Sequence, residues 1–526
     1  MKKNKIRLQS LEIVFLIGLF MHQYVMSNKF FNYFEMGNIM ADMSYSQGDT
    51  LEQGKWFLPV ATNLFTGYSI PSVNGALLIG YLSITAFLIC ELLGIRSLAG
   101  RVLSGLAVLS FPGMASAFSY GVNSDAIGLG ILLAVLGVWV FEKYRFGIFP
   151  GLLLIGFSIG IYQPSVAVAI AVLYGILFCR AFQEQFDGKE LVKEGLKKAL
   201  LLLAGFIFYY GMLQIILKVM GTGLSSYHGV DSMTSFTLKG IAKGFVYAYV
   251  YFLRYFFLRD YTDSLLRLLG NYAGAILFVV FLAGCFKRIK AYHNKGQGLW
   301  FLLLVALLPL GVDAAPFLMA DRVGTGVGIY MLFSMTVLWA LFVRLLEQWR
   351  SDHGRQGESL ICEGQGRLER AITWGSIAAV AFTVFNGYIL CNQAYHRMEA
   401  MTVTTTSIIE RMVARIEQMP EWKSDMPVYF ADPRPLVNEN YQVDVERYDR
   451  MENLVGTEIV PWYNERAIAR YMNVYLRFPV TLATEEQKEK LDEDPAVGQM
   501  PSFPDKDSIQ VIDGVLVVKV SNGEEQ

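Results

Sequence analysis

The stretch SNKFFNYFEMGNIMADMSYSQGDTLEQGKWFLPVATNLFTGYSIPS (residues 27–72) is polar and lies between two apolar runs, 10–26 and 73–93. Each run has about the length that an α-helix needs to cross a bilayer. The polar stretch carries the carboxylates Asp42 and Asp49. It is therefore either the first outer loop of a membrane protein, with chemistry at the membrane face, or a solvated connector.

The composition extends this interpretation to most of the chain. The 526 residues are 54% hydrophobic and 17% charged, whereas soluble domains are about 45–50% apolar and about 25% charged. The pattern predicts a mostly α-helical, polytopic membrane protein with about eleven transmembrane helices. The predicted spans are 10–26, 73–93, 98–118, 125–142, 147–161, 164–179, 199–220, 271–286, 298–312, 324–344 and 371–391.

Net charge, cysteine spacing and the motifs of the sequence disfavour several other classes of protein. The formal net charge of −1 gives no indication of nucleic-acid binding. The five cysteines show no metal-ligand spacing, so neither a disulfide framework nor a zinc site is predicted. The chain has no Walker A signature, and its predicted spans carry no charge at their midpoints. Both features disfavour a pump or an ion-coupled transporter.

Lysine and arginine gather in every second loop, beginning with residues 2–7. By the positive-inside rule this pattern places the N-terminus in the cytoplasm. The loop 27–72, Asp125 and the Tyr162-Gln163 turn then face outward, as does a tail of residues 392–526. The chain therefore divides into a membrane domain, 1–391, and an extracytoplasmic domain, 392–526.

One outward segment, residues 221–270, breaks the charge pattern because it is basic and aromatic. Its part from 238 to 269 is too charged for a span and favours an interfacial amphipathic helix. Arg254 and Arg259 lie in this part. Such a helix could hold a lipid phosphate, or it could only anchor the chain to anionic headgroups.

The tail has the pattern of a small α/β domain. Residues 396–419 have apolar residues at helical spacing, and residues 426–432 and 508–520 have the composition of strands. Asp513-Gly514 is a hairpin signal of the type I′ turn. We expect the tail to serve as structure or to contact the acceptor of a reaction.

Five stretches together resemble a known family. They are SQGDTLEQGKWFLPV (46–60), YSIPSVNGALLIGYLSITAFLICELLGI (68–95), FPGMASAFSYGVNSDAIGLGILLAV (111–135), IGIYQPSVAVAIA (159–171) and PSFPDKDSIQVIDGVLVVKVS (501–521). In order and spacing the chain resembles the serotype-converting O-antigen glucosyltransferases (Gtr type II), membrane enzymes of the GT-C class. Family members often show paired acidic residues in the first outer loop and a Gly-Arg-Trp. Here the second motif is Gly54-Lys55-Trp56, and either Asp42 or Glu52 could supply a second carboxylate.

The resemblance implies a polyprenyl-phosphate-sugar donor such as undecaprenyl-phosphate-glucose and a cell-surface glycan acceptor outside the cytoplasmic membrane. It also implies a small flippase and a cytoplasmic synthase of the donor lipid as partners. Sugar transfer from a phosphate ester needs a general base for the acceptor hydroxyl. It also needs positive charge at the leaving phosphate, from arginines or from a divalent cation such as Mg²⁺ or Mn²⁺.

We assign the general base to Asp49, with Asp42 assisting it or binding a metal. Asp125 would support the base or bind the acceptor; alternatively Asn123, Ser124 and Asp125 only cap the helix that begins there.

The remaining assignments concern substrate binding. Tyr162 and Gln163 would hydrogen-bond a sugar, or they form only an interfacial turn. Arg322 is the first choice for the donor phosphate, followed by Arg254 and Arg259. Lys55 and Trp56 complete the predicted substrate-binding set.

Two alternatives stay open. The first is a transporter or flippase for a lipid-linked saccharide or polysaccharide, which predicts a polar path through the spans and activity that survives loss of Asp49. The second is a GT-C enzyme for another sugar, such as mannose or galactose.

Overall fold

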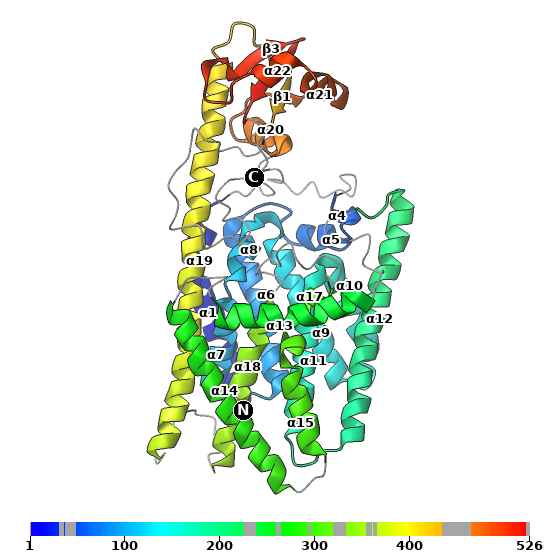
Figure 1. Cartoon of the computed structure of the whole chain (residues 1–526), viewed down its shortest axis with the longest axis vertical. Helices are drawn as coiled ribbons and strands as arrows, with labels where there is room; N and C mark the ends of the chain where they lie inside the picture. The colour runs from blue at the N-terminus through cyan, green and yellow to red at the C-terminus, as the bar shows by residue number, and fades with distance from the viewer. Residues whose placement is uncertain are drawn as a thin grey trace.

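The computed structural model describes residues 2–30, 36, 49–225, 238–258, 265–292, 296–318, 333–353, 360, 366–433 and 464–521. Three residues with predicted site roles, Asp42, Arg259 and Arg322, lie outside these ranges, and their roles stay predictions. Most of the described chain is helical (Figure 1).

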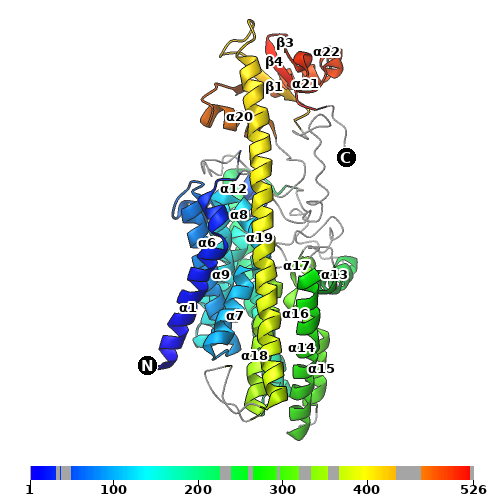
Figure 2. The same ribbon diagram turned by 90° about the vertical axis from the view of Figure 1, so that its left-hand side faces the viewer.

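The first half of the chain forms a bundle around α9, which packs against α6 and α10. Its helices are α1 (Lys2–Met21), α2 (Gln23–Ser27), α6 (Pro71–Leu93), α7 (Leu98–Leu109), α8 (Gly113–Ser119), α9 (Ser124–Lys143), α10 (Ile148–Ile161), α11 (Val166–Ala181) and α12 (Gly188–Met220). Two short helices, α4 (Asp49–Glu52) and α5 (Leu58–Asn63), lie at the end of the bundle that faces the C-terminal sheet (Figure 1). The N-terminus lies toward the opposite end (Figure 2).

Within the described residues, six helices are long and apolar enough to cross a membrane, or seven if the bent pair α7–α8 is one span. The pair bends by 55° at Pro112, where the missing backbone N–H interrupts the helical hydrogen bonds. These helices are compatible with a membrane protein. The predicted number of about eleven spans stays a prediction, because the other predicted spans fall on shorter or interrupted helices or on residues described only in part.

The second half of the chain adds α13 (Leu238–Phe257), α14 (Leu265–Ala291), α15 (Gln297–Ala306), α16 (Leu308–Val312), α17 (Ala315–Leu318), α18 (Thr336–Asp352) and α19 (Arg367–Ile416). α13 lies across the direction of the other helices (Figure 1). This is the arrangement that we expect of an interfacial helix. The predicted amphipathic segment 238–269 is nevertheless not one helix, because α13 ends at Phe257 and α14 begins at Leu265.

α19 is a single helix of 50 residues, about 75 Å long at 1.5 Å per residue. It runs along the bundle and continues to the C-terminal sheet (Figures 1 and 2). The predicted domain boundary at residue 391 therefore falls inside a helix, and the division of the chain into two domains stays a prediction.

The C-terminal sheet has the strand order β2-β1-β4-β3, with β1 parallel to both of its neighbours and β3 antiparallel to β4. Its strands are β1 (Pro427–Ala431), β2 (Thr481–Leu482), β3 (Ile509–Ile512) and β4 (Val515–Lys519), and its helices are α20 (Glu465–Val474), α21 (Glu485–Asp492) and α22 (Pro495–Gln499). The hairpin signal is confirmed: Asp513 and Gly514, with φ of 49° and 76°, join β3 to β4.

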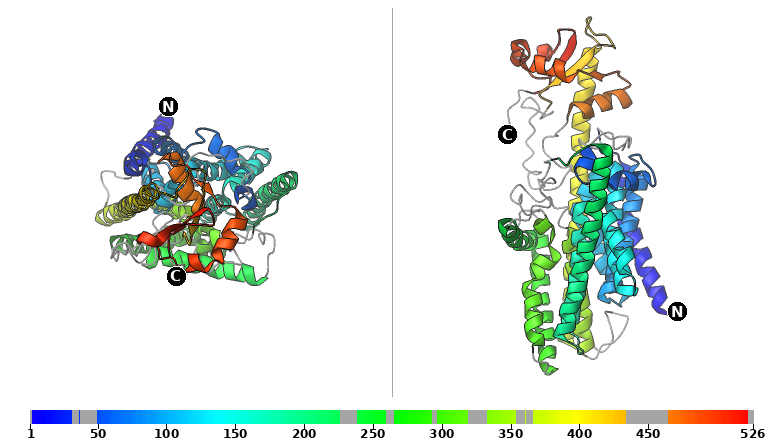
Figure 3. Two further views of the ribbon diagram at one scale, coloured as in Figure 1. Left: turned by 90° about the horizontal axis from the view of Figure 1, so that it is seen from above. Right: turned by 90° about the vertical axis from the view of Figure 1, so that its right-hand side faces the viewer.

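Apolar residues of α19 and α20 pack against β1 and β4 to form the core of this unit, which includes Ile408, Met412, Phe430, Met472 and Leu516. The unit lies over the end of the bundle that carries α4 and α5 (Figures 1 and 3).

Candidate functional site

A short glycine turn fixes the backbone between α4 and α5. The Lys55 N–H donates to the Thr50 carbonyl oxygen (3.0 Å) and the Gly54 N–H to that of Leu51 (2.8 Å), which is the hydrogen-bond pattern of a Schellman motif. Gly54 has a φ of 76°, a conformation that glycine adopts without steric cost. α4 begins at Asp49, and the role of this residue as general base stays a prediction.

Trp56 anchors this turn to α10. Its side chain is 3% exposed, and its ring centroid lies 5.6–6.4 Å from those of Phe57, Phe157 and Phe208. The indole sits directly against Gly160, where an added Cβ would come within 2.8 Å of the ring. The geometry makes Trp56 a packing residue that positions Lys55, and its contact with substrate stays a prediction.

The Tyr162-Gln163 turn separates α10 from α11 and contacts the segment around Lys55. Gln163 Nε2 donates to the Gln53 carbonyl oxygen (2.7 Å), and the Phe57 N–H donates to that of Gly160 (2.8 Å). The ammonium of Lys55 lies 6.0 Å from the centroid of the Tyr162 ring. The structure therefore brings together two pairs of residues that the sequence predicts from separate motifs, Lys55 with Trp56 and Tyr162 with Gln163.

α12 and the residues after it also contact the segment around Lys55. The hydroxyl of Tyr209 donates to the Gly54 carbonyl oxygen (3.0 Å). Glu52 accepts a hydrogen bond from the Thr222 hydroxyl at Oε1 (2.8 Å) and one from the Ser225 N–H at its carbonyl oxygen (3.0 Å). These contacts leave little freedom to the backbone on either side of Lys55.

Lys55 is the cation of this segment. Its side chain is half-buried, and Nζ donates to Oε1 of Gln53 (2.8 Å). Desolvation by burial lowers the pKa of Lys55 to about 8. The group is therefore an ammonium at neutral pH, held where little water competes with an anion.

Asp125 is the buried carboxylate of the site. It lies in the first turn of α9 and is 1% exposed. Oδ1 accepts from Nδ2 of Asn74 (3.2 Å), and Oδ2 has no hydrogen-bond partner among the described residues. Asn123, which precedes the helix, makes no side-chain cap; its Oδ1 accepts from the Thr62 hydroxyl (2.9 Å) instead. A buried carboxylate with an unused oxygen can accept a further hydrogen bond, such as one from a sugar hydroxyl.

Asn74 links Asp125 to the chain before α6. Its Nδ2 also donates to the Thr66 hydroxyl (3.1 Å), and its Oδ1 accepts from the Ile70 N–H (2.9 Å). Sequence reasoning missed this residue, although an asparagine in the first turn of a long apolar run was a visible signal.

Asp313 is a second buried carboxylate, and the sequence assigned it no role. It follows α16, is fully buried, and both of its carboxylate oxygens lack a partner among the described residues. Burial raises the pKa of Asp313 well above its ordinary value. The signal in the sequence was a carboxylate directly after an apolar run. An uncompensated buried carboxylate is typical of functional sites.

Two remaining expectations concern cations. Arg254 lies on the exposed side of α13, with its guanidinium 5.9 Å from the Tyr251 ring centroid, and its role stays a prediction. Across the described ranges, no group of three or more His, Cys, Asp or Glu side chains could hold a metal ion.

Fold and site define a class of protein: a bundle of apolar helices compatible with a membrane, with buried polar and ionisable side chains gathered at one end. The model of one family, the glucosyl transferases GtrII, matches residues 23–343, and the chain belongs to this family. No curated protein and no solved structure matches the chain. Family membership and the apolar helices together support a membrane glycosyltransferase.

Proposed function

We propose that the protein transfers a glucosyl group from a polyprenyl phosphate to a cell-surface glycan at the outer face of the cytoplasmic membrane. In this proposal the protein is multi-pass and its N-terminus is cytoplasmic. The end of the bundle with α4 and α5, and the C-terminal sheet beyond it, are extracytoplasmic. A small flippase and a cytoplasmic synthase would supply the donor lipid.

One observation carries the chemistry: a half-buried cation and a buried carboxylate are fixed at the same end of the bundle. α5 connects them, because Leu58 at its start follows Lys55 by three residues and Thr62 near its end bonds Asn123, next to α9. A desolvated cation can stabilise the negative charge of a leaving phosphate. A carboxylate can orient or deprotonate a sugar hydroxyl.

The reaction follows from these roles. The acceptor hydroxyl oxygen forms a bond to the anomeric carbon of the donor sugar while the bond from that carbon to the phosphate oxygen breaks. The hydroxyl proton passes to a carboxylate, for which we propose Asp49 with Asp42 beside it. The electron pair of the broken bond leaves with polyprenyl phosphate, whose charge Lys55 stabilises together with Arg254, Arg259 and Arg322. Asp125, Tyr162 and Gln163 would hold the acceptor or the donor sugar.

The test uses the full-length protein in nanodiscs with undecaprenyl-phosphate-glucose, and measures release of undecaprenyl phosphate with and without a glycan extract. We expect acceptor-dependent release that falls by about 10²-fold or more in Asp49→Asn. The matched control is Asp187→Asn. Asp187 caps α12 at the opposite end of the bundle, and asparagine caps equally well.

The possible results separate the assignments. Full activity in Asp49→Asn would move the base to Asp42 or Asp125, which the corresponding asparagine variants would then distinguish. No release with any lipid-linked sugar would contradict enzyme function and favour transport of a lipid-linked saccharide.

A further inference from the structure

A basic cavity of about 740 Å³ lies at the end of the bundle opposite α4 and α5, between the ends of α6, α9 and α11. Its lining cations are Arg7, Arg96, Lys143, Arg180 and Arg344. Two carboxylates, Glu91 and Glu142, complete the charged lining and leave a formal charge of +3 from five cations and two anions.

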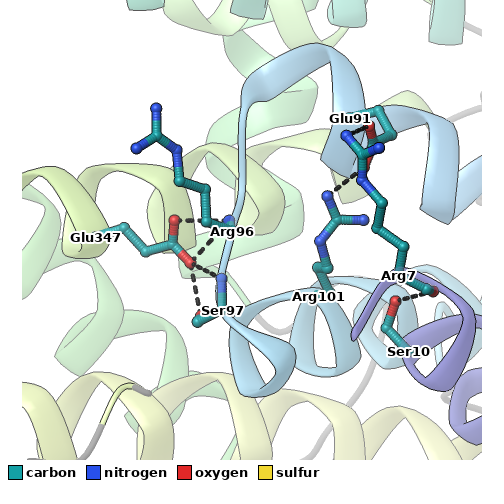
Figure 4. Close-up of polar contacts among 7 residues, drawn as sticks. All are labelled: Arg7, Ser10, Glu91, Arg96, Ser97, Arg101 and Glu347. Carbon is teal, nitrogen blue, oxygen red and sulfur yellow. Dashed lines mark hydrogen bonds and ion pairs between the residues drawn. The ribbon is translucent and has the colours of Figure 1, made fainter. Parts of the chain in front are cut away.

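Both carboxylates are already neutralised by ion pairs. Glu91 pairs with Arg7 and with Arg101 (Figure 4), and Glu142 pairs with Lys198. Arg101 and Lys198 are not among the residues that line the cavity. Because Glu91 and Glu142 pair with these cations, part of the negative charge of the two carboxylates is neutralised from outside the cavity. The potential inside the cavity is therefore positive.

A third carboxylate, Glu347, is near but is used by the backbone. It accepts from the N–H groups of Arg96 and Ser97 (2.9 Å each) and from the Ser97 hydroxyl (2.6 Å). It thus binds the two backbone N–H groups directly before α7, and its negative charge lies near the N-terminus of this helix. Figure 4 shows the guanidinium of Arg96 extending away from Glu347.

Three of the lining cations have no carboxylate within ion-pair distance in the described part of the chain: Arg96, Lys143 and Arg344. The ammonium of Lys143 lies 4.2 Å from the centroid of the Trp139 ring, and Arg344 Nη2 donates to Oε1 of Gln348 (3.1 Å). Cations that share one cavity repel each other unless an anion lies between them. Basic loops that only contact bulk headgroups need no such cavity.

The apolar part of the lining indicates the kind of anion. Phe87, Leu92, Leu93 and Ile176 line the same cavity as the cations. Trp139 also lines it, and tryptophan is the residue type that gathers at the headgroup level of a bilayer. A ligand that combines an anionic group such as a phosphate with an apolar body would match both parts of this lining.

We propose that this cavity binds the phosphate headgroup of an anionic phospholipid from the cytoplasmic leaflet, with Arg96, Lys143 and Arg344 as its cationic ligands. The proposal rests on the proposed orientation of the bundle in the membrane and not on the proposed sugar transfer. The cavity lies at the other end of the bundle from Lys55 and Asp125, so the two sites are separate.

The test measures binding of phosphatidylglycerol to the full-length protein in a neutral detergent by native mass spectrometry. The variant is Arg96→Gln/Lys143→Gln/Arg344→Gln. The control, Lys193→Gln/Lys197→Gln/Lys287→Gln, removes three exposed lysines outside the cavity lining, on the cytoplasmic side of the proposed orientation. Each lost cation should weaken binding by about five-fold. We therefore expect a roughly hundred-fold loss in the variant and less than about three-fold in the control.

Three results would overturn the proposal: an equal loss in the control, equally tight binding of phosphatidylcholine, or displacement of the lipid by inorganic phosphate at the same concentration. If the triple variant fails to fold, Arg96→Gln alone should still weaken binding by about five-fold. Donor turnover is measured in the same preparations in phosphatidylcholine nanodiscs and should not change in either variant. A protein that binds the lipid and lacks turnover would contradict the proposed function only.

Discussion

The contact between Trp56 and Gly160 gives the sharpest test of how the loop is positioned. In Gly160→Ala the new Cβ would lie 2.8 Å from Cε2 of Trp56. An ordinary carbon contact is about 3.5–4.0 Å, so the indole and the turn that carries Lys55 must move by roughly 0.7 Å or more. Aromatic rings on its other sides prevent the indole from yielding freely.

Two opposing effects determine how Gly160→Ala changes the free energy of unfolding. Overpacking of this kind costs about 1–3 kcal/mol, while replacing a helical glycine by alanine stabilises by up to about 1 kcal/mol. We therefore expect Gly160→Ala to lose about 0–3 kcal/mol of unfolding free energy. A shift approaching 1 Å at Lys55 should reduce donor turnover by about 10-fold to 100-fold.

The assay compares apparent Tm and release of polyprenyl phosphate in three proteins. Gly211→Ala is the matched control, because no atom of the described residues lies within 4 Å of an added Cβ at this position in α12. It should keep activity and gain stability. Trp56→Phe combined with Gly160→Ala should recover part of the activity, since the smaller ring relieves the contact. If Gly160→Ala is as active as wild type and as stabilised as the control, the indole does not position the loop.

Three further predictions follow. Lys55 is protonated below its pKa of about 8, so the KM for the donor should rise as pH increases through 8, by about ten-fold at pH 9. Steady-state kinetics should show this rise in wild type and not in Lys55→Arg. A KM that does not change with pH in wild type would remove Lys55 from the phosphate site. Asn74→Leu removes the acceptor of the Ile70 N–H and the donor to Oδ1 of Asp125. This change should lower the free energy of unfolding by about 2–4 kcal/mol. An unchanged apparent Tm would show that water replaces the Asn74 side chain. Burial raises the pKa of Asp313, so the stability that its protonated form provides is lost as pH rises through that raised pKa. The apparent Tm of Asp313→Asn should therefore increase relative to that of wild type as pH rises. If the apparent Tm of both proteins depends on pH in the same way, the desolvation argument is wrong.

The sequence predicts those parts of the fold that depend on local chemistry. Hydropathy places most of the helices, and Pro112 and the Tyr162-Gln163-Pro164 turn mark two of the breaks. Both halves of α19 were predicted as helical, residues 371–391 as a span and residues 396–419 in the tail. Their continuity in one helix was not predicted, because hydropathy ends the apolar part near residue 391. The helix continues since the chain has neither glycine nor proline from Tyr388 to Met419.

The candidate site depends on contacts that no local pattern contains. Gln163 and Gln53 are 110 residues apart, and Tyr209 and Gly54 are 155 residues apart. Both contacts are made to backbone carbonyl oxygens, which every residue type offers, so the composition of the loop gives no sign of them. Asn74 was missed, and Asp313 was given no role, for a related reason: a single polar residue beside an apolar run is a weak signal until its burial is known.

The local geometry also bears on the Gly-Arg-Trp that the resemblance to the family implies at positions 54–56. Gly54 is fixed by its positive φ, and Trp56 is fixed by the aromatic rings and Gly160 around its indole. The Lys55 side chain between them is half-buried, and its ammonium donates a hydrogen bond to Oε1 of Gln53. Backbone conformation therefore favours glycine at position 54 and packing favours a large aromatic residue at position 56, whereas position 55 is less constrained. An arginine there would keep its charge at any pH, while Lys55 has a pKa of about 8. Lys55 therefore carries a positive charge at neutral pH, and under the proposed function donor binding should weaken in the alkaline range.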